Sequence, residues 1–582
     1  MWKKAELSDN AKMLINVGYP KISSIVMGNA GISTKEEAER FLHSEEVHDP
    51  AEIRNIEAVS DIIWSHIYKG SRICIFADYD ADGITGGAIL YLALKRLGAD
   101  VVVRVPDRIY EGYGISKKAV LEQIELGAKL FITIDNGIRA IEEIELIREM
   151  GCQSVILDHH QPGETLPNPD AMIDLWIEGE TYPFRELTGS GLAWKVVCYM
   201  LTQVDDYDYG MSLVDLAAIG TIADVAPLIG ENRAIVKRAI NRMRDPWYDR
   251  EGVRAIYGKS LDRITTEDIA FQIAPCINAP GRLYEQGAKL PLLLLLENDD
   301  KTARMLATKV SDANAERKKL QQQWCEQLEG EAERRVEAGE KVLVMLADGA
   351  PSGIVGLIAG NLKEKYNRPA IIFAPKQDIS GETVWCGSGR SVRGLHLLNG
   401  LNACADLFIH YGGHELAAGM TIPSDKEILS ELRKRLNEEA SYLSEEDLTP
   451  VVYWDTEITE RELTSELYEE LQSLEPFGAG VAKPVFKMEL HASGREKNHD
   501  LMGADKSHLK LYCDSYSAVG FSLAAKYIRT ELPDTVVGLG YPSENYFNGK
   551  VYRQFTLLDF EPLTLQCKLV PQGKEYGEDE VM

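Results

Sequence analysis

Three short clusters of aspartate and histidine could do chemistry in this chain, and each follows a run of apolar residues. They are the segments DYDADG at 78–83, DNG at 135–137 and DHH at 158–160, after the runs at 72–77, 130–134 and 154–157. Carboxylates that gather in one place repel one another unless protons or cations compensate them. The clusters therefore predict a site for divalent metal ions and, with it, a hydrolytic reaction.

The ligand types also indicate which metal would bind. Carboxylates with one imidazole fit Mn²⁺ better than Zn²⁺ or pure Mg²⁺ chemistry. Two such ions, about 3.5–4 Å apart, could bridge a phosphate oxygen, generate hydroxide and stabilise the leaving oxygen. The nine cysteines form no CxxC pair, which argues against a thiolate zinc site and suits a reducing cytoplasm.

The first cluster taken alone has two duller interpretations. A calcium-binding EF-hand loop also begins D-x-D-x-D-G, but it needs a glutamate at its twelfth position, where this chain has Ile89. A solvated acidic turn is the other interpretation. Because Asp78, Asp80 and Asp82 alternate with other residues, an extended chain would place their side chains on one side.

The other acidic and histidine residues gain their value from position. Asp135 lies in an Asp-Asn-Gly sequence, which also favours a turn. It follows the predicted strand at 130–134, the second strand after the one at 72–77. His159 or His160 taken alone could be structural. Asp224 follows an apolar helix, where a carboxylate near the helix C-terminus is electrostatically disfavoured. Something else must therefore hold Asp224 in place.

These residues can act together only if the fold brings them to one place. Short apolar runs bounded by turn residues and separated by helix-like stretches predict parallel strands near 72–77, 100–105, 130–134 and 153–157. Helices are predicted after Gly189-Ser190-Gly191 and over 211–222. Ligands gather at the carboxyl ends of such strands. An α/β domain over 51–245 would therefore place the three clusters on one edge of a sheet.

At 582 residues the chain is too long for a single core, so several domains are expected. The other predicted segments are a helical segment at 1–50, a helical connector at 246–340 with a long helix over 300–338, a second α/β region at 341–425, an acidic linker-like helix at 426–448, a small β-barrel at 449–565 and a flexible tail at 566–582. No apolar stretch approaches the ~20 residues that span a bilayer, and the start has no signal-like core. We therefore expect a cytoplasmic protein with no membrane partner.

The net charge of −28 limits how this chain could hold a polyanion. A protein that bound nucleic acid only by neutralising phosphates would usually be basic. A few arginines at specific positions, together with metal ions, would have to bind the polyanion. The candidates are Arg108, Arg282, Ser388 with Arg390, and His414 beside two glycines. Each of them taken alone fits an ordinary loop better.

Taken together, these motifs resemble the DHH phosphoesterase superfamily, and within it the RecJ-type exonucleases specific for single-stranded DNA. The resemblance covers nearly the whole chain. It includes the three clusters and the segments GTIADVAPL at 220–228, INAPGR at 277–282, GGH at 412–414 and LEPFG at 474–478. It implies an α/β fold with a parallel-sheet DHH domain, a long connecting helix, a smaller α/β DHH-associated domain and a C-terminal OB-fold barrel.

The resemblance also implies roles for individual residues. The implied metal ligands are Asp80, Asp82, Asp135, His159 and Asp224, with Asp135 bridging two ions of Mn²⁺ or Mg²⁺. The residues implied to orient the ligands or to contact the scissile phosphate are Asp78, Asp158 and His160. The terminal 5′-phosphate would be held by Arg108, Ser388 and Arg390, and the DNA backbone by Arg282 and His414.

The implied reaction is stepwise 5′→3′ hydrolysis of single-stranded DNA to 5′-mononucleotides, in DNA repair and recombination. A monomer is expected, with a single-strand-binding protein and a helicase as further partners. Two alternatives stay open. A phosphodiesterase for very short oligonucleotides or cyclic dinucleotides would be shorter and would lack the barrel at 449–565. A non-catalytic replication or repair scaffold would not need the intact aspartates and histidines.

Overall fold

The computed structural model describes residues 1–43, 45–378, 381–493, 497–503, 506–531, 533–547 and 550–563, so the predicted tail at 566–582 lies outside the described residues. The chain forms two compact units. The first contains Met1–Thr34, Val451–Glu475 and the residues from Lys483 onward; the second contains Lys35–Pro450 and Pro476–Ala482. None of the described helices combines the length and apolar character that a membrane crossing requires.

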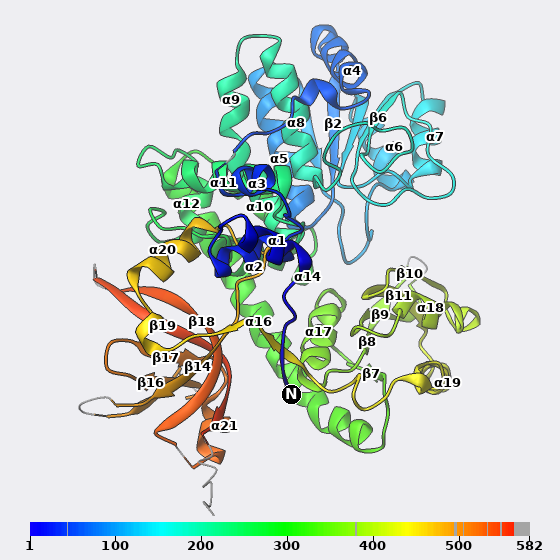
Figure 1. Cartoon of the computed structure of the whole chain (residues 1–582). Helices are drawn as coiled ribbons and strands as arrows, with labels where there is room; N and C mark the ends of the chain where they lie inside the picture. The colour runs from blue at the N-terminus through cyan, green and yellow to red at the C-terminus, as the bar shows by residue number, and fades with distance from the viewer. Residues whose placement is uncertain are drawn as a thin grey trace, which may run out of the picture. The chain divides into compact units, whose positions relative to one another are not determined.

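The second unit begins with a five-stranded parallel sheet in the order β3-β2-β4-β5-β6. Figure 1 labels the strands β2 and β6 of this sheet. Its strands are β2 (Arg72–Ala77), β3 (Val101–Arg104), β4 (Ala128–Ile134), β5 (Gln153–Leu157) and β6 (Ala171–Ile173). Its helices are α3 (Lys35–His43), α4 (Ile56–Lys69), α5 (Ala81–Arg96), α6 (Lys117–Glu125), α7 (Ile141–Glu149) and α8 (Gly189–Thr202). The four predicted strands are confirmed. Because β2, β4 and β5 are neighbours, the three clusters follow adjacent strands.

A helical region continues the second unit. Its helices are α9 (Tyr207–Ser212), α10 (Val214–Ala223), α11 (Gly230–Arg244), α12 (Glu251–Tyr257), α13 (Thr266–Asp268), the π-helical turn η2 (Ile269–Ile273), α14 (Ala274–Leu283), α15 (Lys289–Leu296) and α16 (Asp300–Glu337). The helix α16 runs for 38 residues and confirms the predicted long helix. The side chain of Asp299 caps it by accepting a 2.9 Å hydrogen bond from the backbone N–H of Thr302.

A second, mixed sheet follows α16, in the order β10-β11-β9-β8-β7. Its elements are β7 (Leu343–Leu346), α17 (Val355–Tyr366), β8 (Ala370–Gln377), β9 (Thr383–Arg390), α18 (Leu397–Asn402), β10 (His410–Gly413), β11 (Ala417–Pro423) and α19 (Lys426–Glu439). The helix predicted at 426–448 is present as α19, but the prediction that it is a linker is wrong. Leu429, Leu432 and Leu436 of α19 are buried in the core of this sheet, because an acidic helix can still bury one apolar stripe.

The first unit combines both ends of the chain. A seven-stranded sheet has the order β13-β14-β18-β19-β17-β16-β15. Its strands are β13 (Thr456–Glu457), β14 (Phe486–His491), β15 (His499–Met502), β16 (His508–Tyr512), β17 (Ser517–Gly520), β18 (Thr535–Phe547) and β19 (Lys550–Pro562). The accompanying helices are α1 (Asp9–Asn16), α2 (Lys21–Asn29), α20 (Ser465–Ser473) and α21 (Ala524–Arg529).

The predicted helical segment at 1–50 contains three helices, α1, α2 and α3, but it also contains a strand and is divided between the two units. Strand β1 (Trp2–Lys4) pairs in parallel with β12 (Val452–Trp454), and α3 belongs to the other unit. Strand β12 therefore does not join the seven-stranded sheet. A short alternating run predicts a strand but carries no information about the strand that it pairs with.

Eight cysteines lie among the described residues, and all are free thiols. Cys74, on β2, and Cys198, on α8, are buried, whereas Cys325 on α16 and Cys386 on β9 are half-buried.

Candidate metal centre

The loop from β2 into α5 arranges the first acidic cluster. Asp80 is the N-cap of α5, and its side chain accepts hydrogen bonds from the backbone N–H groups of Asp82 (3.0 Å) and Gly83 (3.2 Å). Since the helix begins at Ala81, the expectation of an extended segment with three aligned aspartates is wrong. The same early helix start leaves no twelve-residue loop of the EF-hand kind. A Cβ on Gly83 would lie 2.6 Å from the backbone of Asp78, so glycine permits this tight entry.

Asp82 is fully buried and holds the beginning of a second helix. Its carboxylate oxygens accept from the backbone N–H groups of Gly189 (2.7 Å) and Ser190 (3.0 Å), in the first turn of α8. A carboxylate is stabilised at a helix N-terminus by the helix dipole. A Cβ on Gly189 would lie 2.7 Å from Cβ of Asp135. The sequence marked these glycine and serine residues only as a helix start, and their closeness to the aspartates was missed.

Asp135 lies at the end of β4 in a strained conformation. Its φ angle of +62° is in the left-handed region, which costs a non-glycine residue about 1–3 kcal/mol. Its backbone is held on both sides: the N–H donates to the carbonyl of Leu157 (3.0 Å), and Tyr113 donates its hydroxyl to the carbonyl of Asp135 (2.8 Å). The surrounding fold therefore fixes this carboxylate between its neighbours.

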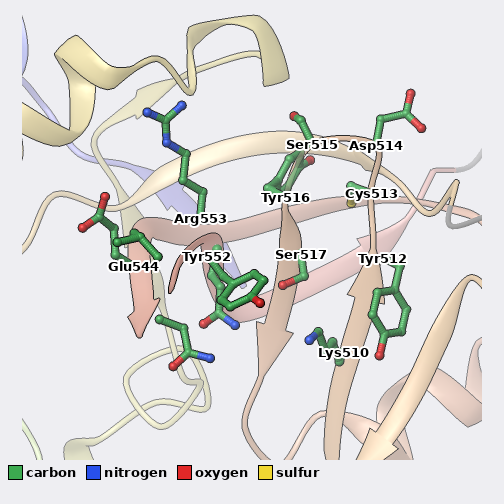
Figure 2. A pocket seen from close by; sticks show the side chains of 13 residues that line it. Lys510, Tyr512, Cys513, Asp514, Ser515, Tyr516, Ser517, Glu544, Tyr552 and Arg553 are labelled. Carbon is green, nitrogen blue, oxygen red and sulfur yellow. The ribbon is translucent and has the colours of Figure 1, made fainter. Parts of the chain in front are cut away.

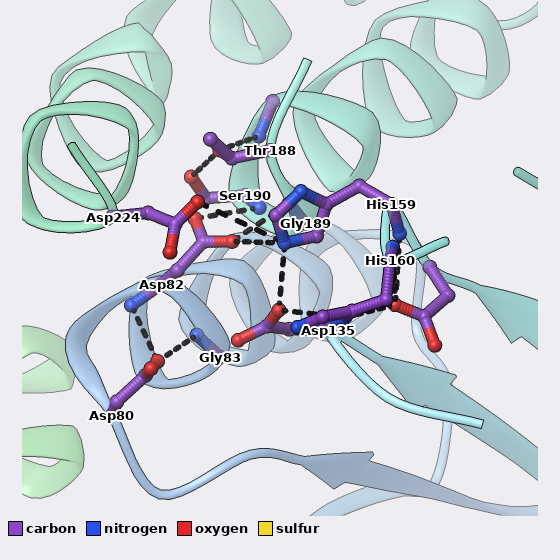
Figure 3. A network of polar contacts seen from close by, with 12 residues as sticks. Asp80, Asp82, Gly83, Asp135, His159, His160, Thr188, Gly189, Ser190 and Asp224 are labelled. Atoms are coloured by element: carbon purple, nitrogen blue, oxygen red, sulfur yellow. Dashed lines mark hydrogen bonds and ion pairs between the residues drawn. The ribbon is translucent and has the colours of Figure 1, made fainter. Parts of the chain in front are cut away.

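Four of the five predicted ligands meet at one imidazole nitrogen (Figure 3). Nε2 of His159 lies 3.1 Å from Asp135, 3.8 Å from Asp82 and 3.9 Å from Asp224, measured to the nearest carboxylate oxygen. The ligand atoms form two overlapping groups: Asp135 with His159 and His160, and Asp135 with Asp78 and Asp80. Asp135 belongs to both groups, as expected for a ligand that bridges two ions. Asp78, predicted to orient ligands or to contact the scissile phosphate, also belongs to one of these groups.

Asp158 has a different position from the other aspartates. Its buried carboxylate accepts from the backbone N–H of Ile138 (2.9 Å) and contacts Nδ1 of His160 at 2.7 Å. It therefore orients the imidazole of His160. Although burial opposes the charge, the hydrogen bond with Asp158 raises the pKa of His160 to about 9. His160 is therefore a cation at neutral pH, beside the carboxylate cluster.

The electrostatics of the cluster favour the binding of cations. Burial raises the pKa of Asp78 and of Asp135, and the neighbouring aspartates add to both shifts. Burial, Asp82 and Asp80 raise the pKa of Asp224 to about 8. Burial lowers the pKa of His159, so its imidazole is neutral and able to coordinate. Among the described residues, Oδ1 of Asp78 is buried without a hydrogen-bond partner. Oxygen donors with one neutral imidazole fit Mn²⁺ or Mg²⁺.

Three of the predicted phosphate-binding arginines also come together. Burial and the neighbouring Arg108 lower the pKa of Arg282 to about 9, and the same two causes lower the pKa of Arg390. Such shifts mean that the guanidinium groups repel one another, which a bound anion would relieve. Arg390 donates to the hydroxyl of Ser388 at 3.1 Å. A Cβ on Gly356, in the first turn of α17, would lie 2.9 Å from that hydroxyl oxygen, so the pair faces a helix N-terminus.

His414 lines a cavity of about 280 Å³. This cavity is lined by Tyr113, Arg139, Asp158, His160 and His414, among others. It therefore opens beside the cationic imidazole of His160. No role was predicted for Tyr113 or Arg139, because a tyrosine between two glycines and a single arginine after a turn are common in loops.

The first unit carries a larger groove of about 1000 Å³ (Figure 2). Aromatic side chains line it together with charged side chains of both signs. The lining includes the tyrosines Tyr512, Tyr516 and Tyr552, the cations Lys510 and Arg553, and the carboxylates Asp514 and Glu544. Tyr552 is 46% exposed. An open groove with tyrosine rings and positive charges is able to stack unpaired bases and to hold their phosphates.

Comparisons with known proteins agree with this arrangement. Three family models match the chain: the DHH family N-terminal domain at residues 72–221, the DHHA1 domain at 339–441 and the RecJ OB domain at 454–559. The single-stranded-DNA-specific exonuclease RecJ of Bacillus subtilis is 34% identical over 97% of this chain and 70% of its own length. This chain belongs to the RecJ family. The RecJ of Escherichia coli is 30% identical over 80% of this chain and 83% of its own length.

Solved RecJ structures share the fold. The RecJ of Thermus thermophilus in complex with Mn²⁺ has a TM-score of 0.77 and 27% identity, and the match covers 96% of this chain and 78% of that one. A structure of the same protein with Mg²⁺ has a TM-score of 0.71. The architecture is therefore that of RecJ: a DHH domain, a long helix, a DHHA1 domain and an OB domain. The acidic and histidine side chains of this family member are positioned to hold metal ions.

Proposed function

We propose that this chain is a metal-dependent exonuclease that degrades single-stranded DNA from the 5′ end and releases 5′-mononucleotides. The observation that carries the proposal is the meeting of Asp82, Asp135 and Asp224 within 4 Å of Nε2 of His159. Like-charged carboxylates this close together, two of them buried, are stable only with protons or cations. Membership of the RecJ family indicates that the substrate is single-stranded DNA.

The described residues suggest how the metal centre is built. The residues that would hold two ions of Mn²⁺ or Mg²⁺ are Asp78, Asp80, Asp82, Asp135, His159 and Asp224. When bound, such ions supply a hydroxide nucleophile at neutral pH and stabilise charge on the phosphate. The protonated His160, fixed by Asp158, donates a hydrogen bond to a phosphate oxygen. Tyr113 and the backbone of Leu157 keep Asp135 in its strained, ligand-ready conformation.

The polarity of degradation follows from the arginine cluster. Arg108, Ser388 and Arg390 form a site in which mutual repulsion of guanidinium groups is relieved by a dianion, and a terminal 5′-phosphate has that charge. Arg282, which shares this repulsion, would contact the backbone further along the strand. His414 would act in the cavity beside His160, where it reaches the nucleotide that is about to be released.

Specificity for single strands fits the groove of the first unit. Tyrosine rings stack on bases only where the bases are unpaired. A chain with a net charge of −28 cannot hold DNA by its general surface, so Lys510, Arg553 and the arginine cluster must provide local positive potential. The match to a RecJ OB domain also distinguishes this chain from a phosphodiesterase for very short oligonucleotides.

A nuclease assay tests the proposal. Single strands with a 5′-phosphate, labelled at the 5′ or the 3′ end, are incubated with the purified full chain and Mn²⁺, Mg²⁺ or EDTA. We expect 5′-labelled mononucleotide first, no cleavage in EDTA and little cleavage of blunt duplex. Intact 5′-phosphorylated strands in Mn²⁺ would contradict an enzymatic function. Faster hydrolysis of a dinucleotide than of a long strand would instead support the oligonucleotide phosphodiesterase.

The expected partners belong to the same proposal. The chain would work as a monomer, with a single-strand-binding protein and a helicase that supply and expose the strand. Light scattering at working concentration measures the oligomeric state, and strand degradation with and without each partner measures their effect. A stable dimer, or the same rate on partly duplex DNA with and without a helicase, would argue against these partners.

A further inference from the structure

The segment Pro476–Ala482 lies in the second unit, although the residues before and after it belong to the first. We refer to it as the PFG segment, after its residues 476–478. It forms a tight turn, in which Gly478 and Val481 exchange backbone hydrogen bonds of 2.9 and 3.1 Å. Val481 is fully buried. The metal centre as described above makes no use of this segment.

Three hydrogen bonds attach the PFG segment to the residues that follow α10, the helix that ends at Asp224. The backbone N–H of Leu228 donates to the carbonyl of Ala479 at 2.7 Å. The hydroxyl of Thr266 donates to the carbonyl of Phe477 at 2.8 Å, and the Arg233 guanidinium donates to the carbonyl of Pro476 at 2.7 Å. Thr266 and Arg233 are both buried, so these bonds are protected from water.

The packing at this junction leaves no room for additional atoms. A Cβ on Gly478 would lie 2.6 Å from Cδ1 and 3.2 Å from Cγ of Leu228, and Leu228 is itself buried. Gly480 has a φ angle of +73°, and a Cβ there would lie 3.2 Å from Cβ of Pro227. The PFG segment is therefore in direct van der Waals contact with residues 227 and 228.

Residues 227 and 228 come directly after the strained end of α10. Asp224 is the C-cap of that helix, and the next residue, Val225, has a φ angle of +60°. A β-branched residue rarely adopts this left-handed conformation, which usually falls to glycine at a helix C-terminus. The side chain of Val225 is 71% exposed, so its own packing does little to hold it. The backbone N–H groups of Val225 and Ala226 donate to the carbonyls of Ile222 and Thr221, at 3.2 Å each, and close a turn at the helix end. The anchored residues that follow keep this turn in place.

We propose that the PFG segment is a strap that positions Asp224 for metal binding. It clamps Leu228, the clamp holds Val225 in its strained conformation, and Val225 fixes the direction in which Asp224 leaves the helix. Asp224 needs such support, because its side chain is the most exposed of the ligands that meet at His159, at 36%. The strap rests on the metal centre of the proposed function and makes its affinity depend on residues far along the chain.

The Thr266 hydroxyl provides a conservative test. Thr266→Val removes the donor to Phe477 with little change of shape, and Thr266→Ser keeps the donor. Mn²⁺ affinity of the full chain is measured by titration calorimetry without DNA. Loss of a residue that orients a ligand typically weakens metal binding 10–100-fold, so we expect about 10-fold weaker binding in Thr266→Val. Thr266→Ser should bind within about twofold of the parent chain, since its hydrogen bond is kept.

A pair of glycine variants tests the clamp itself. Gly478→Ala pushes a methyl group against Leu228, whereas Gly360→Ala, in α17, meets nothing within 4 Å. We expect about 10-fold weaker Mn²⁺ binding in Gly478→Ala and no change in Gly360→Ala. In a chain that also carries Val225→Gly, the left-handed conformation needs no clamp, and the effect of Gly478→Ala should shrink to about twofold or less.

The outcomes separate the strap from the proposed function. Thermal unfolding of each metal-free variant shows whether it is folded. If Gly478→Ala does not fold, the comparison of Thr266→Val with Thr266→Ser tests the strap instead. Folded Thr266→Val and Gly478→Ala chains that bind Mn²⁺ like the parent chain would overturn the strap, even if the parent degrades DNA. An effect of Gly478→Ala that is equally large with Val225→Gly would also overturn it. An inactive parent chain with the expected metal affinities would contradict the nuclease and leave the strap supported.

Discussion

Single residues of this chain show how a buried acidic site is kept ready for cations. Asp80 and Asp82 each hold a helix N-terminus with the same carboxylate that faces the metal centre. Asp135 is in a strained conformation, and Asp158 fixes the imidazole of His160. The ligands are therefore positioned by the backbone before any ion arrives, which lowers the reorganisation that binding requires.

Replacing Asp135 with asparagine should abolish hydrolysis and stabilise the metal-free chain. The variant loses the ligand common to both groups of metal-binding atoms, and it also loses one of the buried like charges. We expect activity to fall by about 10³-fold or more, within the range that removal of a main catalytic group produces. The melting temperature in EDTA should rise. Asp312→Asn, on the exposed face of α16, should change neither quantity.

The stability of the metal-free chain should fall as the pH rises from about 4 to 8. Asp224 binds its proton more tightly when folded, with a pKa raised to about 8, so the protonated state favours folding. Ionisation through this window removes that stability, and a bound cation restores it. Mn²⁺ should therefore raise the melting temperature more at pH 8 than at pH 6. Equal shifts at both pH values in scanning calorimetry would show that protons and metal do not compete.

At the scale of elements, parallel strands and helix N-termini bring distant residues together. The strands β2, β4 and β5 are neighbours, so three clusters spread over about 80 residues of sequence share one edge. The helices α5 and α8 begin at this edge, and their dipoles face Asp80 and Asp82. In the DHHA1 domain, the first turn of α17 faces Ser388 and Arg390 in the same manner.

Arg390→Ala should reduce the preference for a 5′-phosphate more than it reduces the chemical step. A hydrogen bond from a charged donor contributes about 1.5–3 kcal/mol, so the ratio of kcat/KM for 5′-phosphate over 5′-hydroxyl strands should fall by about 10-fold or more. Arg393→Ala serves as the control, because Arg393 is exposed three residues further along. An equal loss of kcat/KM on 5′-phosphate and 5′-hydroxyl strands would show that Arg390 does not bind the 5′-phosphate.

Much of the second unit could be predicted from its sequence, since buried parallel strands appear as continuous apolar runs. The runs before Asp78, Asp135 and Asp158 predicted β2, β4 and β5, and this order placed the clusters together. The packing of α19 and the pairing of β1 with β12 could not be predicted, because they depend on partners far away in the sequence. The same holds for the contact of Gly478 with Leu228, which 250 residues separate.

At the scale of the whole molecule, the chain divides its work between two units. The second unit contains the carboxylates, the arginine cluster and the cavity beside His160. The first unit contains the seven-stranded sheet with its aromatic groove. Under the proposed function, hydrolysis at the DNA end and retention of the DNA strand would depend on different residues and should respond to different substitutions.

Tyr552→Ala should weaken binding of long single strands and leave the hydrolysis of short ones unchanged. Stacking of one base on an aromatic ring contributes about 1–3 kcal/mol, so the dissociation constant for a long strand should rise by about 10-fold. Tyr68→Ala is the matched control, because Tyr68 is 80% exposed on α4 of the other unit. Fluorescence anisotropy with labelled strands in EDTA gives the affinity. An unchanged affinity of Tyr552→Ala for long single-stranded DNA would show that the DNA does not bind in this groove.

The buried thiol on β2 has a consequence for the enzyme under oxidative stress. Burial raises the pKa of Cys74 to about 12, and only the thiolate form of cysteine reacts readily with peroxides or alkylating reagents. The strand that leads to Asp78 is therefore chemically inert. Among the described cysteines on β2 and β9, Cys386 is the more accessible, two residues before Ser388. Under the proposed function, oxidation of Cys386 would act beside the residues proposed to hold the 5′-phosphate and away from the metal ligands.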